Sequence, residues 1–496
     1  MGRAWSLAGV LAVVLSGSAV AAPIVGPLPA NDLQPLLGLT GGITPAFVVV
    51  QHPPEPRLAA VPRARCGRGS HPLAGVQGRV TQADVAAPAA ARGWTCNVRV
   101  LGHEATPGGF RTWRYVDAHG HECAFYDTSL ASPLGVFSAA AGPSPGVTVL
   151  DMSHPAHPLV TATLTSPAML APHESLNLNA RRGLLAAEMG SGAALPGIMA
   201  LYSVRQDCRH PVLDWSGRAA RFGHESGFSP DGRTFWIDGG EGIAAVDVSD
   251  PQHPRTLGDY DEYAHGLTVS DDGDRLYVAD PINGQLAIID SSQVQQRRPA
   301  PMLREVSRLT WDTVAIPQNT APMTIAGHRY LLEFDEFAFR FSALGPPDTV
   351  GGARIIDIGD EAHPHVVSNL RLAVNQPAEH AAADSDPSPL PAPVTNYASH
   401  YCAIPREVDP QIVACSFINS GLRVFDIRDP RHPREVAYYV SPPAAASLAG
   451  SQKSDFAMSQ PAFVPRRREV WYTDATSGFY ALRLAERVWP HPTRRP

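Results

Sequence analysis

The sequence predicts an all-β protein, a seven-bladed β-propeller with four-stranded blades, whose last blade is closed by a strand from near the N-terminus. Three observations lead to this prediction: a composition rich in turn residues, a strand motif that recurs seven times, and a last repeat without its fourth strand. Glycine (42) and proline (48) are abundant among the 496 residues. Such a composition favours short strands joined by turns and excludes a helical bundle.

The recurring motif is a glycine, an alternating apolar strand and an aspartate, followed by Asp-Pro and His-Pro dipeptides. It is clearest at 242–254 and 421–433. Its seven copies begin at Gly146, Gly197, Gly242, Gly284, Gly352, Gly421 and Gly478. Successive glycines lie 42 to 69 residues apart, a spacing that suits one four-stranded blade. The His-Pro dipeptide should start the outermost strand, where a residue without an N–H does least harm.

The two ends of the repeat region predict how the ring closes. The last repeat offers strands at 461–464, 469–473 and 478–484, and then the repeat pattern ends. The segment 97–102 resembles an outer strand but has no repeat before it. We therefore expect this segment to complete the last blade, because pairing removes both exposed edges. Ring closure through both ends predicts one propeller domain over residues 96–485.

The segments outside the propeller predict an exported protein. Arg3, an apolar run and small residues at 19–21 indicate a cleaved signal peptide over residues 1–21. This predicts a secreted or periplasmic protein with no transmembrane segment in the mature chain. Residues 22–95 form a Pro, Ala and Arg-rich N-terminal extension, and 486–496 a C-terminal tail. Two further stretches, 377–397 and 441–453, are expected to be long surface loops.

The six cysteines all follow the predicted signal peptide, where oxidation is permitted. Cys402 and Cys415 lie symmetrically about a turn on neighbouring strands, so they should face each other and form a disulfide. The other four cysteines permit three pairings, and the sequence does not choose between them. They are Cys66, Cys96, Cys123 and Cys208.

The motif at 242–254 and 421–433 resembles the repeat of the exported LVIVD-repeat proteins, which are regarded as β-propellers. The resemblance covers roughly residues 97–485 and implies the fold, but no settled activity. A weaker, architectural similarity is to selenium-binding proteins, including bacterial methanethiol oxidases, in which histidines are implicated in metal binding. No long motif supports this second similarity.

One position of the repeat carries polar residues that could bind a ligand or take part in catalysis. The innermost strands of six units open with His173, His224, His265, Gln318, His400 and Gln460. The first unit departs from this pattern, with Phe110, Arg111 and Thr112. Equivalent residues of successive blades form a ring around the axis, so the four histidines should converge at one mouth of the central channel. Single histidines at such positions often only bond a neighbouring backbone, but four at one level favour a metal site.

Four imidazoles suit a transition metal, with iron or copper favoured. If the protein is an enzyme, a metal-dependent oxidoreductase acting on a small molecule is the favoured class. Glu174 and Glu225 follow two of the histidines; because strand neighbours point to opposite faces, each should accept an N–H from the next blade's imidazole, or instead pair with an arginine. His103 could be a further contributor, or lie in a solvated loop.

A rival interpretation is a non-catalytic binding module whose rim loops hold a protein, glycan or cell-envelope partner. A nucleic-acid partner is not expected, since 40 basic and 47 acidic residues give a net charge of −7. The sequence contains no P-loop and no HExxH motif. The aspartates that end the repeated strand, Asp151, Asp247, Asp357 and Asp426, are expected to cap turns.

Overall fold

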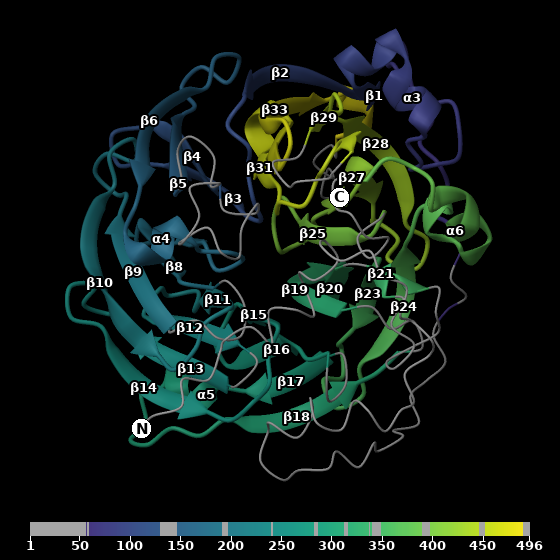
Figure 1. The fold of residues 1–496 in the computed structure, drawn as a ribbon. Helices are drawn as coiled ribbons and strands as arrows, with labels where there is room; N and C mark the ends of the chain where they lie inside the picture. The colour runs from purple at the N-terminus through teal and green to yellow at the C-terminus, as the bar shows by residue number, and fades with distance from the viewer. Residues whose placement is uncertain are drawn as a thin grey trace, which may run out of the picture.

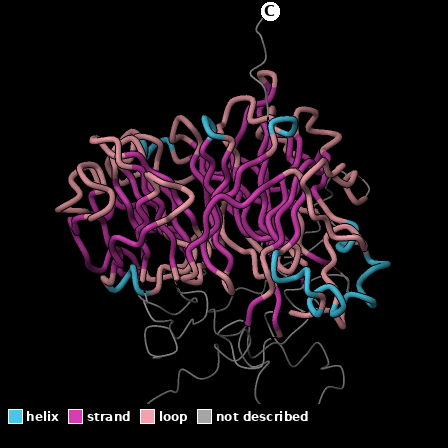
Figure 2. Tube along the Cα trace, turned by 90° about the horizontal axis from the view of Figure 1, so that it is seen from above, coloured by secondary structure: helices cyan, strands magenta, loops and turns pink. Residues whose placement is uncertain are grey.

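The computed structural model describes residues 56, 59–128, 146–190, 197–239, 242–281, 286–311, 316–336, 338–339, 349–388, 397–445 and 452–489. Its strands form seven antiparallel sheets set in a ring around a central axis, as Figure 1 shows. Seen from the side, the strands make one layer with loops and short helices at its two faces (Figure 2). The segment 1–21, where the signal peptide was predicted, lies outside the described residues.

The first four blades each consist of four consecutive strands, the first innermost and the fourth outermost (Figure 1). Blade 1 contains β3 (Thr112–Val116), β4 (Glu122–Asp127), β5 (Val147–Asp151) and β6 (Leu159–Leu164). Blade 2 contains β7 (Asn177–Asn179), β8 (Leu184–Glu188), β9 (Gly197–Ser203) and β10 (Val212–Ala220). Blade 3 contains β11 (Glu225–Phe228), β12 (Thr234–Gly239), β13 (Gly242–Asp247) and β14 (Arg255–Tyr260). Blade 4 contains β15 (Gly266–Val269), β16 (Arg275–Ala279), β17 (Leu286–Asp290) and β18 (Arg304–Leu309).

The remaining blades follow the same order, with insertions. Blade 5 contains β19 (Ile316–Ile325), β20 (His328–Glu336), β23 (Ala353–Asp357) and β24 (His365–Leu370), with the short pair β21 (Ala338–Phe339) and β22 (Thr349–Val350) between its second and third strands. Blade 6 contains β25 (Ser399–Ala403), β26 (Ile412–Phe417), β27 (Gly421–Asp426) and β28 (Arg434–Val440). Blade 7 contains β31 (Ala462–Val464), β32 (Glu469–Asp474), β33 (Gly478–Leu484) and β2 (Val98–Glu104). The pair β29 (Ala444–Ala445) and β30 (Lys453–Ser454) lies between blades 6 and 7 in the chain.

The ring closes as predicted, because β2 near the N-terminus pairs antiparallel with β33 and supplies the outer strand of blade 7. The preceding strand β1 (Trp94–Cys96) pairs with β28 and adds a fifth strand to blade 6. The segment before the propeller therefore packs on blade 6, where it also forms the helices α3 (Gln82–Ala86) and η2 (Pro88–Arg92).

The burial of each strand follows from its place in the blade. The second and third strands are buried on both faces, since neighbouring blades cover them, and β12, β26 and β32 have no exposed residue. Outer strands alternate between exposed and half-buried residues, as in β10. In every blade the pairing of the third and fourth strands contains a register shift. Such bulges increase the local twist that inclines each blade to the next.

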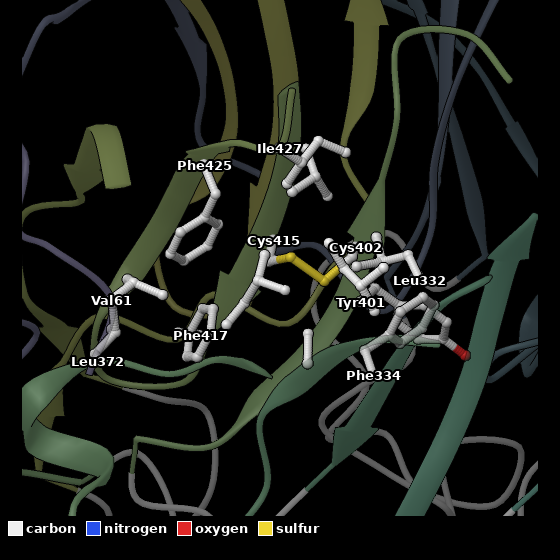
Figure 3. Packing of buried hydrophobic residues seen from close by; sticks show 14 of the residues in the cluster. Val61, Leu332, Phe334, Leu372, Tyr401, Cys402, Cys415, Phe417, Phe425 and Ile427 are labelled. Atoms are coloured by element: carbon white, nitrogen blue, oxygen red, sulfur yellow. A yellow bond between two sulfur atoms is a disulfide. The ribbon is translucent and has the colours of Figure 1, made fainter. Parts of the chain in front are cut away.

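The predicted disulfide is confirmed: Cys402 and Cys415 pair directly across β25 and β26, with Cα atoms 4.0 Å apart, inside a hydrophobic cluster of blade 6 (Figure 3). The two pairings that the sequence left open are Cys66 with Cys96 and Cys123 with Cys208. Three disulfides fit an extracellular or periplasmic protein. No helix among the described residues has the length and apolar character needed to cross a membrane.

The other helices that the structure describes are short, and all but the last lie between strands. They are α4 (Pro167–Leu170), α5 (Ser292–Gln295), η3 (Ala373–Asn375), α6 (Pro377–Ala383), η5 (Pro465–Arg467) and η6 (Glu486–Val488). The loop predicted for 377–397 is wrong in its first part, where α6 forms. Pro377 takes the first helical position, where its missing N–H costs nothing, and four of the six residues that follow are alanines, which favour a helix.

Candidate metal centre

The structure brings the four predicted histidines together at the axis. His224 and His265 directly precede the inner strands β11 and β15, and His400 lies in β25. The ring of His224 lies 4.8 Å from that of His173 and 4.8 Å from that of His265, between centroids. Phe110 takes the equivalent place in blade 1, with its ring 4.5 Å from His173 and 5.4 Å from His400. The five rings come from five different blades.

Backbone carbonyls hold two of the imidazoles in a fixed orientation. His265 Nδ1 lies 2.8 Å from the carbonyl of Pro317, and His400 Nδ1 lies 2.8 Å from that of Met458. A carbonyl only accepts, so we assign the hydrogen to Nδ1 in both rings. The free lone pair of each neutral ring is then on Nε2, as in many histidine metal ligands.

Two carboxylates lie among the imidazole nitrogens. Glu174 Oε2 is 3.2 Å from His224 Nε2, and its Oε1 is 3.1 Å from His400 Nε2. Glu336, at the end of β20, places Oε1 3.2 Å from His265 Nε2 and Oε2 3.2 Å from His400 Nε2. Glu174 is 1% exposed and Glu336 7%. The cluster therefore combines imidazole and carboxylate donors, which the expected four-imidazole site did not.

Glu174 enters the cluster because the local backbone is not a strand. The expectation that neighbours point to opposite faces assumed that His173 and Glu174 begin the inner strand, but β7 starts only at Asn177. His173 has a left-handed backbone, with φ of 49°, in a turn that the N–H of Ser175 closes onto the carbonyl of Pro172. This turn directs His173 and Glu174 to the same side, with His173 Nε2 4.0 Å from Glu174 Oε2.

The carboxylate of Glu174 has no regular hydrogen bond. Both of its oxygens are buried and make no hydrogen bond with any residue that the structure describes, and the same is true of His224 Nε2. The nearest nitrogens, His224 Nε2 and His400 Nε2, lie at ion-pair distances of 3.2 and 3.1 Å. Buried polar atoms that converge without bonding one another are costly unless something else binds them. The donor set fits a metal cation.

The electrostatics divide the histidines into two kinds. Burial lowers the pKa of His224, but the carboxylates of Glu174, Asp238 and Glu336 together raise it to about 9. For His400 the pKa is likewise lowered by burial and raised, to about 9, by Glu174 and Glu336. Burial lowers the pKa of His173 to about 3, and it also lowers that of His265. Burial raises the pKa of Glu174, but the neighbouring histidines lower it well below its usual value.

Arg111 forms the floor beneath this cluster. Its guanidinium pairs with Glu225, and Nε donates to the backbone carbonyl of Glu174 at 2.9 Å. Nη1 donates to Gln460 Oε1 at 2.6 Å, and Cζ lies 4.2 Å above the centre of the Tyr401 ring. Arg111 is 4% exposed. A single side chain of blade 1 thereby joins blades 2, 3, 6 and 7 at the axis.

Three predicted pocket residues belong to this floor and not to the histidine cluster. Glu225 is paired with Arg111 and accepts a hydrogen bond from the Tyr401 hydroxyl at 2.5 Å. Of the two roles expected for Glu225, it therefore has the ion pair with an arginine and not the contact with an imidazole. Gln318 Nε2 donates to the Tyr401 hydroxyl at 2.8 Å, while Gln460 binds Arg111. Their polar atoms are thus directed at Arg111 and Tyr401.

His103 lies elsewhere in the fold. It is on the outer strand β2, where Nε2 is 2.6 Å from the carbonyl of Ser477 and the ring stacks on Tyr480 at 4.5 Å. It faces neither the axis nor the other histidines, since the fourth strand of a blade is the farthest from the axis.

Glu336 is the cluster residue that the sequence analysis missed. It ends the second strand of its blade, and acidic residues recur at or next to that position in other blades: Asp127, Glu188, Asp238 and Asp474. This recurrence was the available signal. Second strands end at the level at which inner strands begin, and Asp238 is close enough to raise the pKa of His224. Burial raises the pKa of Asp127 and of Asp238 to about 7.

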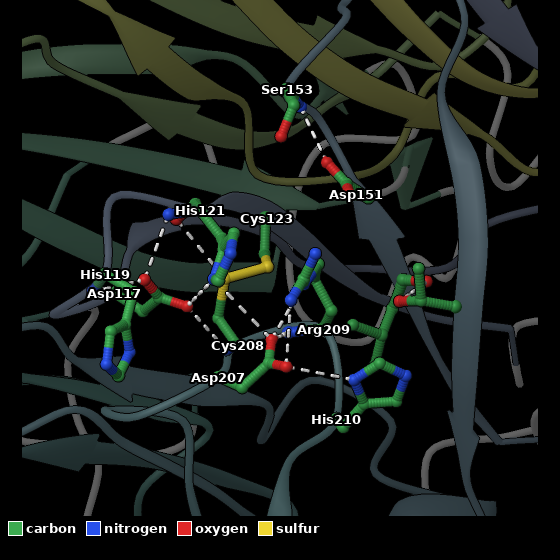
Figure 4. Close-up of a disulfide and its surroundings, with 12 residues drawn as sticks. Asp117, His119, His121, Cys123, Asp151, Ser153, Asp207, Cys208, Arg209 and His210 are labelled. Atoms are coloured by element: carbon green, nitrogen blue, oxygen red, sulfur yellow. Dashed lines mark hydrogen bonds and ion pairs between the residues drawn. A yellow bond between two sulfur atoms is a disulfide. The ribbon is translucent and has the colours of Figure 1, made fainter.

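A third group with the spacing of metal donors, Asp117, His121 and Asp207, surrounds the disulfide between Cys123 and Cys208 (Figure 4). Its atoms already have partners. Asp117 Oδ1 accepts the N–H groups of residues 119 and 121, and its Oδ2 accepts that of Cys208 at 3.0 Å. Asp207 pairs with Arg209 at 2.8 Å. We interpret this group as a support for the turn that the disulfide anchors.

The repeated motif residues have structural roles, as expected. Asp151, Asp247, Asp357 and Asp426 each accept the backbone N–H two residues on. Four histidines of the His-Pro dipeptides bond the aspartate three residues before them: His210, His253, His363 and His432. His253, for example, lies 2.9 Å from Asp250.

Comparison with known proteins finds one family model and several distant structures. Residues 237–262 match the LVIVD repeat family, in agreement with the resemblance drawn from the motif. The chain is thus a seven-bladed β-propeller that carries the LVIVD repeat. No curated protein matches it. The weaker similarity to selenium-binding proteins stays a prediction.

Solved structures with a similar fold are distant in sequence. A functionally unknown protein from Desulfotomaculum acetoxidans is 11% identical with a TM-score of 0.41, over 69% of this chain and 90% of that one. The periplasmic gluconolactonase of Pseudomonas aeruginosa is 13% identical with a TM-score of 0.45, over 67% and 85%. A β-propeller domain from Myceliophteria thermophila is 14% identical with a TM-score of 0.45, over 78% and 98%.

Proposed function

We propose that the protein is an exported β-propeller that binds a transition metal at its axis and uses it to oxidise a small molecule. The proposed ligands are His173, Glu174, His224, His265, Glu336 and His400. The observation that carries the proposal is Glu174, a buried carboxylate within 3.2 Å of two imidazole nitrogens and without a hydrogen bond to a described residue. A cation between these atoms would satisfy all of them.

The donor chemistry narrows the choice of metal. Imidazoles alone suit iron or copper, and added carboxylates favour iron, because hard oxygen donors bind copper less selectively. Such an ion supplies a Lewis acid and an electron acceptor for a substrate bound beside it. The chain supplies the surroundings: Phe110 covers His173 and His400 on one side, and Arg111 closes the floor. His173 is 24% exposed, His224 15% and His265 12%, so a small molecule would approach past them.

The test is the metal content of protein purified without added ions, measured by mass spectrometry of the elements. We expect stoichiometric iron or copper in the unmodified protein and its loss in the double variant His224→Ala, His265→Ala. The matched control is His253→Ala with His432→Ala, which removes two exposed turn histidines and should keep the metal. Metal-free protein whose thermal stability does not change with a chelator would contradict the proposal.

A second candidate function is a non-catalytic binding module. Exposed apolar side chains on the outer strands of two neighbouring blades favour it: Leu159 and Val212 are each 63% exposed, at the starts of β6 and β10. Free outer edges of this kind can hold an extended segment of a partner protein. Binding of an envelope or extracellular partner by the metal-free protein, weakened by Leu159→Asp with Val212→Asp, would favour this function over the first.

A further inference from the structure

We propose that the axial cluster binds two metal ions and that the carboxylate of Glu174 bridges them. This inference rests on the proposed function, because it assigns the number of ions to the same site. The ligand class is a pair of divalent cations of the first transition series.

The donors divide into two groups that share one residue. His173, Glu174 and His224 form the first, and Glu174, Glu336 and His400 form the second; within each, the donor atoms lie within 4.8 Å of one another. Ligands bonded at about 2.1 Å to one ion lie at most about 4.2 Å apart, so each group needs only a small contraction to hold one ion. Three or four protein ligands leave further positions open on each ion.

The orientation of Glu174 supports a bridge. Its Oε2 faces His224 at 3.2 Å, whereas its Oε1 faces His400 at 3.1 Å. The two oxygens thus face histidines of different groups. A single ion bound to both oxygens could not also bind both His224 and His400. A carboxylate with one oxygen on each of two ions suits the separation of about 3.5 to 4 Å that is typical of two-metal sites.

Glu336 completes the second ion's surroundings. It lies 3.2 Å from His400 Nε2 through one oxygen and 3.2 Å from His265 Nε2 through the other. His265 therefore belongs to the side of the second ion. Each ion then has two histidines and shares Glu174, and the second ion also has Glu336.

Arg111 holds Glu174, the proposed bridging residue, in its position at the axis. Its Nε donates to the backbone carbonyl of Glu174 at 2.9 Å, which fixes the residue from below. The guanidinium itself is a buried positive charge, so a cation cannot occupy the space beneath the carboxylate. Both ions are thus confined to the layer between Arg111 and the partly exposed ring of His173.

The experiment is a titration of the full mature protein with Mn²⁺ after removal of bound metal by a chelator. Calorimetry counts the equivalents, and electron paramagnetic resonance shows whether two ions are coupled. We expect two equivalents and a coupled spectrum. One equivalent would overturn the bridged pair but leave the proposed function standing, and no binding would overturn both.

The variant His173→Ala separates the two ions, since His173 belongs only to the first group and is the most exposed ligand. We expect it to bind one equivalent with an uncoupled spectrum, and His173→Gln, which keeps a polar side chain, to do the same. His103→Ala should keep two coupled ions. A His173 variant that folds, as its circular dichroism shows, and still binds two coupled ions or none would overturn the assignment.

Discussion

Removal of the Arg111 guanidinium should destabilise the propeller more than the loss of any surface charge. The side chain is 5% exposed, and it pairs with Glu225, which is fully buried. It also donates to Gln460 Oε1 at 2.6 Å and lies 4.2 Å above the Tyr401 ring. Arg111→Met keeps the apolar stem but leaves a buried carboxylate without its cation, which costs about 3–5 kcal/mol. We expect a loss of that size in the free energy of unfolding.

The assay is urea unfolding followed by circular dichroism, with two further variants. Arg304→Met is the matched control, because Arg304 is 77% exposed and pairs with Asp290 at 3.2 Å; its loss should cost at most about 1 kcal/mol. Arg111→Met combined with Glu225→Gln removes both charges and should recover at least about 1 kcal/mol relative to the sum of the single losses. Equal losses for the two arginine variants, or strictly additive losses in the double variant, would refute the reasoning.

Three further predictions concern the fold and the limits of the site. Cys402→Ala with Cys415→Ala opens a disulfide with a sequence separation of 13, so the free energy of unfolding should fall by about 3 kcal/mol in urea titrations. Burial raises the pKa of Asp127 to about 7, so its contribution to stability is complete below the unfolded pKa of about 4 and is lost as the pH rises to 7. Between pH 4 and 8 this lowers the free energy of unfolding by about 4 kcal/mol, and Asp127→Asn should remove that decrease. An unchanged pH profile of the free energy of unfolding would contradict this. His103→Ala should leave the metal content unchanged, and a loss of metal would show that β2 contributes to the centre after all.

The sequence was sufficient for the architecture because the fold repeats. Each copy of the motif, such as 242–254, predicts the same strand, turn and outer strand. An ambiguous strand assignment in one copy can therefore be resolved by comparison with the others. The missing fourth strand of the last repeat and the lone segment 97–102 then allowed one closure only. The disulfide between Cys402 and Cys415 followed from the same hairpin register. The helix α6 was missed because nothing repeats there.

The sequence also placed the four histidines at one level, because equivalent positions on inner strands meet at the axis. It did not reveal what surrounds them. Glu174 joins the cluster through a left-handed turn at His173. The alternating pattern of the repeat does not predict this turn. Glu336 comes from the end of a second strand, and only its height along the axis brings it beside His265 and His400.

The sequence by itself thus determined the ring, its closure and which residues face the axis, since these follow from the period of the repeat and the alternation of a strand. The tertiary structure decided which of those residues share a site and with what charge. Side-chain convergence depends on turn conformations and on strand heights, which differ from blade to blade. Arg111, Glu225 and Gln460 thereby became a floor, while Glu174 and Glu336 became partners of the histidines.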